Sequence, residues 1–127
     1  MRIALDTNRY TDFGRGDQEV TQILESAERI YLPLIVIAEL RAGFAYGSRG
    51  RQNEEALQRF LLQPGVGILY PSDATTRFYA EIYRGLRERG ALIPINDLWI
   101  AALVLEHDLV LCTRDKHFKS LPGLRII

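Results

Sequence analysis

The feature that most constrains the fold is the alternation of short apolar runs with longer segments of helical periodicity. Five runs have the length and character of buried strands, at residues 2–5, 29–33, 65–71, 109–113 and 124–127. Helical spacing of apolar residues marks segments 18–27, 34–43, 53–63, 72–90 and 96–107. Alternation of this kind is typical of a parallel sheet with helices on both faces. We therefore expect one α/β/α domain of three layers over residues 1–127, with a mostly parallel sheet of about five strands.

Glycine and polar residues set the expected boundaries of these elements. Residues 7–17 are polar and contain glycine, so we expect a turn region after the first strand. The helix over 34–43 should end near Gly43, and the glycine-rich residues 43–52 should form a mobile loop. Asn53 is the expected N-cap of the next helix. For the helix over 72–90, the expected cap is Ser72 or Asp73, and Gly90 should end it.

Composition excludes several classes of protein. Sixteen Lys and Arg balance sixteen Asp and Glu, which argues against a polyanion-binding protein held by bulk charge. The only cysteine, Cys112, can form no internal disulfide, so we expect a cytoplasmic setting. The N-terminus does not have the pattern of a signal peptide, and the longest apolar run covers nine residues and contains Pro33, whereas a membrane span needs about 20. We expect no membrane association.

Three of four notable acidic residues stand at positions where this fold places functional sites, and the fourth, Glu39, reaches the same edge if its helix packs with that face inward. Asp6 directly follows the first strand, Asp97 starts a helix, and Asp115 comes two residues after Thr113, the end of the fourth strand. Glu39 lies on the helix that follows the second strand. In open parallel sheets, sites lie beyond the carboxyl ends of the strands. We therefore expect the four carboxylates to meet at this edge.

Glu39 is the least ordinary of the four, because it is the only charged residue in the apolar run LIVIAEL. An ionised carboxylate removed from water is costly unless it is paired or binds a metal. Arg41 is poorly placed to pair with Glu39, since residues i and i+2 do not face each other on a helix. The remaining structural explanation is an exposed stripe formed by Glu39, Gly43 and Tyr46.

Each of the other acids has a structural explanation when taken alone. Asp6 could make an Asx turn, Asp97 could favour a helix N-terminus, and Asp115 could cap a short turn. Together they are harder to explain, because two carboxylates ~5 Å apart repel by ~3 kcal/mol at an effective dielectric of ~20. A hard divalent cation would hold such a cluster, and oxygen ligands favour Mg²⁺ or Mn²⁺. Zinc is disfavoured because neither histidine shows ligand spacing with the single cysteine.

Four segments resemble the PIN domain, and within it the VapC-type toxin ribonucleases: LDTN, IAEL, NDLWIAA and TRDKHFKSLPGL. The resemblance covers essentially the whole chain. It implies a Mg²⁺- or Mn²⁺-dependent endoribonuclease that forms a homodimer and is covered at its active site by the tail of a cognate VapB-like antitoxin. It implies a catalytic and metal-binding quartet, with polar residues around it: Asp6, Glu39, Asp97 and Asp115, then Asn8, Asn96 and Thr113.

By this resemblance, Asp6, Asp97 and Asp115 hold the metal in hydrolysis of an RNA phosphodiester, and Glu39 helps to hold the metal or orients the attacking water. Thr113 and Asn96 would fix the carboxylates. The resemblance assigns no role to Arg9 or Arg114. Candidate RNA contacts are Arg49, Arg51, Arg84 and Arg87, although a solvated face explains each of them equally well. The alternative function is a PIN-fold scaffold that cleaves nothing, against which the intact quartet argues.

Overall fold

The computed structural model describes all 127 residues, with five strands, six α-helices and one 3₁₀ helix. The predicted alternation of strands and helices is confirmed. In chain order the elements are β1 (Arg2–Leu5), α1 (Thr7–Gly14), α2 (Gln18–Ser26), β2 (Arg29–Pro33), α3 (Leu34–Tyr46), α4 (Gly50–Leu61), β3 (Val66–Leu69), α5 (Asp73–Glu88), α6 (Ile95–Glu106), β4 (Val110–Cys112), η1 (Lys116–Ser120) and β5 (Arg125–Ile126).

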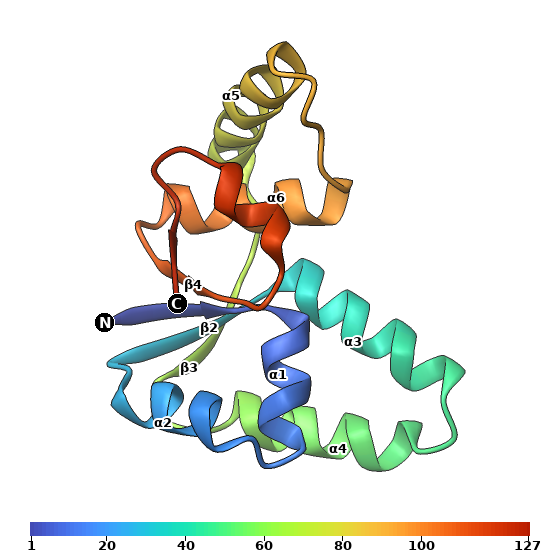
Figure 1. The fold of residues 1–127 in the computed structure, drawn as a ribbon. Coiled ribbons are helices and arrows are strands. Elements are labelled where there is room, and N and C mark those ends of the chain that lie inside the picture. Colours follow the sequence, from blue (N-terminus) through green and yellow to red (C-terminus); the bar gives the residue numbers. More distant parts are fainter.

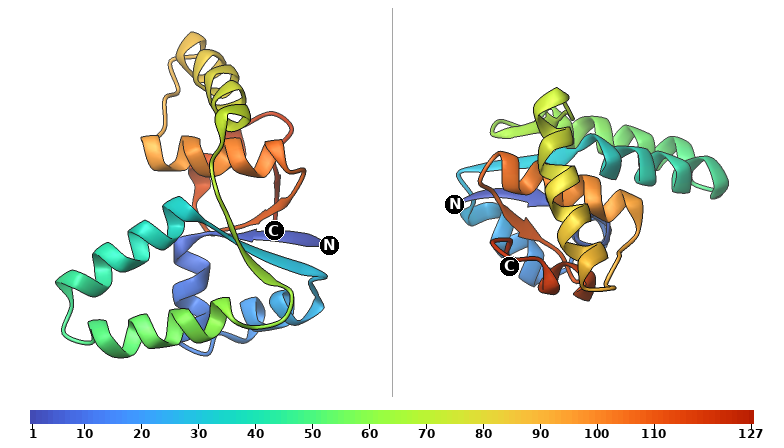
Figure 2. Two further views of the ribbon diagram at one scale, coloured as in Figure 1. Left: turned by 180° about the vertical axis from the view of Figure 1, so that it is seen from behind. Right: turned by 90° about the horizontal axis from the view of Figure 1, so that it is seen from above.

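The sheet has the strand order β3-β2-β1-β4-β5, and every neighbouring pair is parallel. The chain builds outward from β1 through β2 to β3, then returns to add β4 and β5 on the other side. Helices α1, α2 and α4 lie on one side of the sheet, and α5, α6 and η1 lie on the other (Figures 1 and 2). The three-layer α/β/α architecture is therefore confirmed, and its topological switch point lies between β1 and β4.

The core lies on both faces of the central strands. Ile3, Ala4 and Leu5 of β1 have no exposed surface, as expected for a strand covered by helices on both sides. Helix α6 is apolar almost all round and buries six of its residues, while Phe118 of η1 is fully buried beside it. This packing fixes α6 and η1 against the carboxyl end of β4. None of the helices has both the length and the apolar character of a membrane span.

The prediction of a turn region over residues 7–17 is wrong for most of that segment. Residues Thr7–Gly14 form α1, which Asp6 caps by accepting a hydrogen bond from the backbone N–H of Thr7. The rings of Tyr10 and Phe13 pack edge-on against Phe60 of α4, with centroids 5.4 and 5.5 Å apart. Two aromatic side chains one turn apart thus anchor a helix whose sequence is otherwise polar.

The prediction of a mobile loop over residues 43–52 is also wrong. Helix α3 continues through Gly43 to Tyr46, and α4 already begins at Gly50, so only residues 47–49 separate the two helices. A Cβ atom at position 50 would lie 2.5 Å from the backbone oxygen of Phe44, so glycine here permits a close approach of the two helices. Asn53 lies inside α4 and does not cap it.

The start and the end of α5 lie near their predicted positions. Ser72 occupies the N-cap position, and its backbone N–H donates to the hydroxyl of Thr75. Gly90 follows the end of the helix with a φ of 64°, the left-handed conformation that glycine adopts without strain.

Candidate functional site

Four acidic side chains meet at the switch point of the sheet. Asp6 directly follows β1, Glu39 lies in the second turn of α3, Asp97 lies in the first turn of α6, and Asp115 follows β4. The negative charges of Asp97 and Glu39 raise the pKa of Asp6, and those of Asp115 and Glu39 raise the pKa of Asp97. The structure therefore brings the four predicted acids into one electrostatic cluster.

Asp6 is the most buried of these acids, with 4% of its surface exposed. Burial is the main reason that its pKa is raised, while hydrogen bonds from Thr113 and Thr7 act in the opposite direction. The hydroxyl of Thr113 donates to Oδ2 at 2.7 Å, and the backbone N–H of Thr7 donates to Oδ1 at 2.8 Å. The backbone N–H of Asp6 also bonds the carbonyl of Cys112 on β4, which fixes the carboxylate beside the neighbouring strand.

Glu39 lies at the edge of the core rather than inside it. Helix α3 buries Val36, Ile37 and Leu40, and Glu39 is only partly buried next to that face. Its Oε1 accepts a hydrogen bond from the hydroxyl of Thr7 at 2.7 Å, and Oε2 accepts one from Asn96 Nδ2 at 3.4 Å. The apolar run thus places this carboxylate between α1 and α6, on the side of α3 where the helix leaves the core.

The side chain of His117 lies between the carboxylates of Asp97 and Asp115. The side chain of Asp97 is 13% exposed, and burial is the main cause of its raised pKa. His117 Nδ1 lies 3.2 Å from Asp97 Oδ2 and 3.1 Å from Asp115 Oδ1. One ligand atom from each of the three residues falls within 4.8 Å of the other two. Asp115 Oδ1 also accepts the backbone N–H of His117, so its structural explanation as a cap also holds.

The three polar residues predicted around the acids all contact them. Besides its bond to Asp6, the hydroxyl of Thr113 accepts the backbone N–H of Asp115 at 3.0 Å. Asn8 Nδ2 lies 3.3 Å from Asp6 Oδ2 and 3.4 Å from Thr113 Oγ1. Asn96 donates to Glu39, as described above. These contacts orient the carboxylates of Asp6 and Glu39 and fix the backbone at Asp115.

Two residues of the cluster escaped the sequence reasoning. Thr7 bonds both Asp6 and Glu39, and its position inside the LDTN segment was the available signal. The second is His117, which shows no zinc-ligand spacing with Cys112 in the sequence. The sequence signal that could have found it is its separation of two residues from Asp115, because a capping aspartate holds the residue two positions later close to its own carboxylate.

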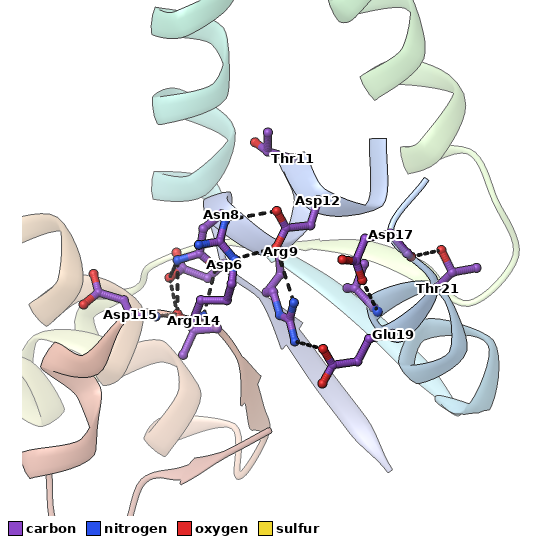
Figure 3. A network of polar contacts seen from close by, with 12 residues as sticks. Asp6, Asn8, Arg9, Thr11, Asp12, Asp17, Glu19, Thr21, Arg114 and Asp115 are labelled. Atoms are coloured by element: carbon purple, nitrogen blue, oxygen red, sulfur yellow. Dashed lines mark hydrogen bonds and ion pairs between the residues drawn. The ribbon is translucent and has the colours of Figure 1, made fainter. Parts of the chain in front are cut away.

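A second polar network borders the acids and is centred on Asp12 (Figure 3). Asp12 accepts hydrogen bonds from Arg114 Nε at 2.6 Å and Nη2 at 3.0 Å, and from Arg9 Nη1 at 3.3 Å. The backbone N–H of Arg114 donates to Asn8 Oδ1. Arg9 is buried and its Nε has no hydrogen-bond partner. The network ties α1 to the segment between Thr113 and Asp115.

The arginines predicted to contact RNA lie away from the acids, on the α3–α4 end of the molecule and on α5 (Figure 1). Arg51 pairs with Glu55, Arg84 pairs with Glu88, Arg87 bonds the hydroxyl of Tyr83, and Arg49 borders a hollow between α1, α3 and α4. None of the four contacts a residue of the quartet.

An apolar hollow adjoins the acidic cluster on the side of Glu39. Helices α3 and α6 form most of its wall, and Glu39 and Asn96 lie at its polar end. The lining residues are Leu34, Ile35, Ala38, Glu39, Ala42, Pro71, Asn96 and Trp99. Leu34 is 39% exposed, which is unusual for a leucine in the first turn of so apolar a helix.

Similar proteins are known from curated sequences and from solved structures. The plasmid stability protein StbB of Pseudomonas syringae pv. tomato is 31% identical over 98% of this chain and 96% of its own length. Ribonuclease VapC1 of Haemophilus influenzae is 34% identical over 85% of this chain and 79% of its own length. A chain in the crystal structure of VapBC2 from Rickettsia felis, bound to a DNA fragment, has a TM-score of 0.88 at 28% identity, covering 100% of this chain and 98% of that one.

The family assignment follows from the extent of the match. The sequence pattern of the PIN domain covers residues 3–124, which include β1 without its first residue, β2, β3 and β4, and every acid of the cluster; only β5 lies beyond it. The chain belongs to the PIN domain family.

Proposed function

We propose that this protein is a divalent-metal-dependent endoribonuclease and the toxin of a toxin–antitoxin pair. The observation that carries the proposal is the convergence of four carboxylates from β1, α3, α6 and the segment after β4 at one edge of the sheet. Two relatives support the choice of reaction and setting, because one is named ribonuclease VapC1 and another lies in a VapBC2 complex.

The donor set fits a hard divalent cation. Asp6 and Asp97 both have a raised pKa, because burial and neighbouring negative charge disfavour their ionised forms. A cation would relieve both effects, and carboxylate oxygens are the ligands that Mg²⁺ and Mn²⁺ take in proteins. Asp6, Asp97 and Asp115 would hold the ion, with Glu39 beside them. Such an ion lowers the pKa of a bound water and stabilises negative charge on a phosphate.

The residues around the quartet supply its geometry. Thr113 and Thr7 direct both oxygens of Asp6, so that carboxylate cannot rotate away from the cluster. Thr7 and Asn96 hold the two oxygens of Glu39 in the same way, leaving Glu39 placed to orient an attacking water. Fixed carboxylates spare the site the cost of ordering them when substrate binds.

The partner chain in our proposal is an antitoxin whose apolar tail enters the hollow beside Glu39. Its wall of leucine, isoleucine, alanine and tryptophan side chains suits an apolar segment, and its polar end opens onto the acids. A tail bound there would cover Glu39 and Asn96. We also propose a homodimer. For Arg49, Arg51, Arg84 and Arg87, contact with RNA stays a prediction.

The test uses the protein freed of any antitoxin, incubated with structured RNAs and Mg²⁺ or Mn²⁺. We expect cleavage that EDTA abolishes and that the Asp6→Asn variant lacks. The matched control is Asp108→Asn, because Asp108 lies at the opposite end of the sheet with a φ of 51°, a conformation that asparagine tolerates. Cleavage that survives EDTA, or that Asp6→Asn retains, contradicts the proposal.

The competing function is a PIN-fold protein that binds partners without cleaving RNA. It predicts that no RNA is cut under any metal condition, while antitoxin binding and dimer formation are retained. The same incubation therefore separates the two functions.

A further inference from the structure

We infer that His117 is a metal ligand of this site, so that the ion held by Asp97 and Asp115 has a mixed oxygen and nitrogen donor set. The inference rests on the proposed function in one respect only, namely that a divalent ion binds at the acidic cluster. It goes beyond the oxygen-only set that the quartet alone would provide, and it changes which ions the site prefers.

The position of the imidazole supports direct ligation. His117 Nδ1 lies 3.2 Å from Asp97 Oδ2 and 3.1 Å from Asp115 Oδ1. Neighbouring ligands of an octahedral ion with bonds of ~2.1 Å are ~3.0 Å apart, since that is the edge of the octahedron. The nitrogen therefore already stands at nearly the ligand-to-ligand separation of one small ion from each of the two oxygens.

The backbone around His117 holds the ring in place. Asp115 caps η1 by accepting the backbone N–H of His117 at 2.9 Å, so the capping carboxylate is also a neighbour of the imidazole. The next residue, Phe118, is fully buried and anchors η1 in the core. Ser120 Oγ donates to the carbonyl of His117. The imidazole is thus positioned by structure that does not depend on its own side-chain contacts.

The two ring nitrogens differ in their surroundings. Nδ1 faces the two carboxylates, whereas Nε2 forms no hydrogen bond with the protein. The side chain is 53% exposed, so water can accept a hydrogen bond from Nε2–H. A neutral ring with its proton on Nε2 leaves the lone pair of Nδ1 free to bind the ion.

A nitrogen ligand has a measurable consequence for metal preference. Carboxylate oxygens suit Mg²⁺ and Mn²⁺ alike, but imidazole is a ligand of first-row transition ions and a poor one for Mg²⁺. His117 should therefore raise the affinity for Mn²⁺ relative to Mg²⁺. A simple hydrogen bond between the imidazole and the two carboxylates would give no such discrimination.

Pulsed electron paramagnetic resonance of bound Mn²⁺ tests this directly, because a coordinated imidazole gives a ¹⁴N modulation. The chain has two histidines, His107 and His117, so the signal can be assigned. His107 contacts Glu106 at the far end of α6 and is the matched control. We expect the ¹⁴N modulation in the wild-type protein and in His107→Asn, and its loss in His117→Asn.

Binding titrations with Mn²⁺ and Mg²⁺ give a second measurement on the same three proteins. We expect His117→Asn to weaken Mn²⁺ binding by about tenfold or more and Mg²⁺ binding by clearly less. Urea unfolding without metal checks that each variant is folded. Equal losses for the two ions would indicate that His117 only positions the carboxylates, and would overturn the inference.

The outcomes also separate this inference from the proposed function. Mn²⁺ bound without ¹⁴N modulation, or with modulation that persists in His117→Asn, overturns the role of His117 while RNA cleavage and its dependence on Asp6 can still be observed. Wild-type protein that binds no Mn²⁺ and cleaves no RNA overturns both.

Discussion

Asp12 carries its negative charge between Arg9, which is buried, and Arg114, which is exposed. Hydrogen bonds from Arg114 and then from Arg9 lower its pKa below the ordinary 3.8, against the opposing effect of burial. Replacing it by asparagine leaves the buried guanidinium of Arg9 without its closest acid. We expect Asp12→Asn to reduce the free energy of unfolding by about 2–3 kcal/mol at pH 7, measured by urea denaturation.

The lowered pKa of Asp12 predicts how the loss of stability in Asp12→Asn depends on pH. A carboxyl group whose pKa is lower in the folded than in the unfolded chain stabilises the fold above its unfolded pKa, and this contribution disappears as pH falls toward its folded pKa. The difference between wild type and Asp12→Asn should therefore be full at pH 7 and shrink below about pH 4. Asp73→Asn, at an exposed aspartate, is the control and should change stability by less than about 0.5 kcal/mol. A difference that stays constant down to pH 3 would contradict this account.

Glu39 offers a test of function without loss of structure. Glutamine keeps an oxygen that can accept from Thr7, and it removes a charge that raises the pKa of both Asp6 and Asp97. We expect Glu39→Gln to weaken Mn²⁺ binding and RNA cleavage, while metal-free stability stays the same or rises. Urea unfolding and metal titration on one preparation measure both effects. A variant that unfolds would show that Glu39 has a structural role instead.

Helices α5 and α6 are joined by a buried polar contact that can be removed alone. The hydroxyl of Thr75 accepts the backbone N–H of Ser72 and donates to Glu106 near the end of α6. Thr75→Val keeps the shape but leaves both partners unbonded, so we expect a loss of about 1–3 kcal/mol in thermal or urea unfolding. The control is Thr76→Val, because Thr76 is exposed and bonds only within its own helix. Equal effects of the two substitutions would contradict the role of this contact.

The strands, α2 and α6 could be predicted from the sequence because their apolar runs and spacing are local signals. Helix α1 could not, because its stability comes from the contact of Tyr10 and Phe13 with Phe60, about fifty residues away in the chain. The loop predicted over residues 43–52 failed for a related reason. Several glycines in a short segment predict flexibility, whereas Gly50 permits close contact of two helices, and Arg41 of α3 pairs with Glu54 of α4.

The acids of the site could be located from sequence because Asp6 and Asp115 closely follow strands, and Glu39 and Asp97 lie on helices with a clear apolar pattern. The sequence could not show which side chains from distant segments contact which of the four acids. Thr7 bonds two different acids, and His117 lies between two others, because α1, α3, α6 and η1 converge in space.

Binding of the proposed ion should stabilise the entire fold, because unfolded chain cannot assemble ligands from four separate elements. A ligand that binds only the native state contributes RT ln(1 + [L]/Kd), about 2.7 kcal/mol at a free concentration 100 times Kd. We therefore expect Mn²⁺ to raise the Tm of the wild type and of Asp108→Asn but not that of Asp97→Asn. An equal rise in Asp97→Asn would show that the ion binds elsewhere.

The strand order β3-β2-β1-β4-β5 divides the acids evenly between two parts of the chain. Asp6 and Glu39 belong to the part that builds β1 to β3, and Asp97 and Asp115 belong to the part that builds β4 and β5. Metal bonds tolerate displacements of only about 0.2 Å. Ion binding therefore depends on the relative positions of these two parts of the chain: a group inserted between α3 and α6 that displaces one part against the other would abolish ion binding with all four acids still present.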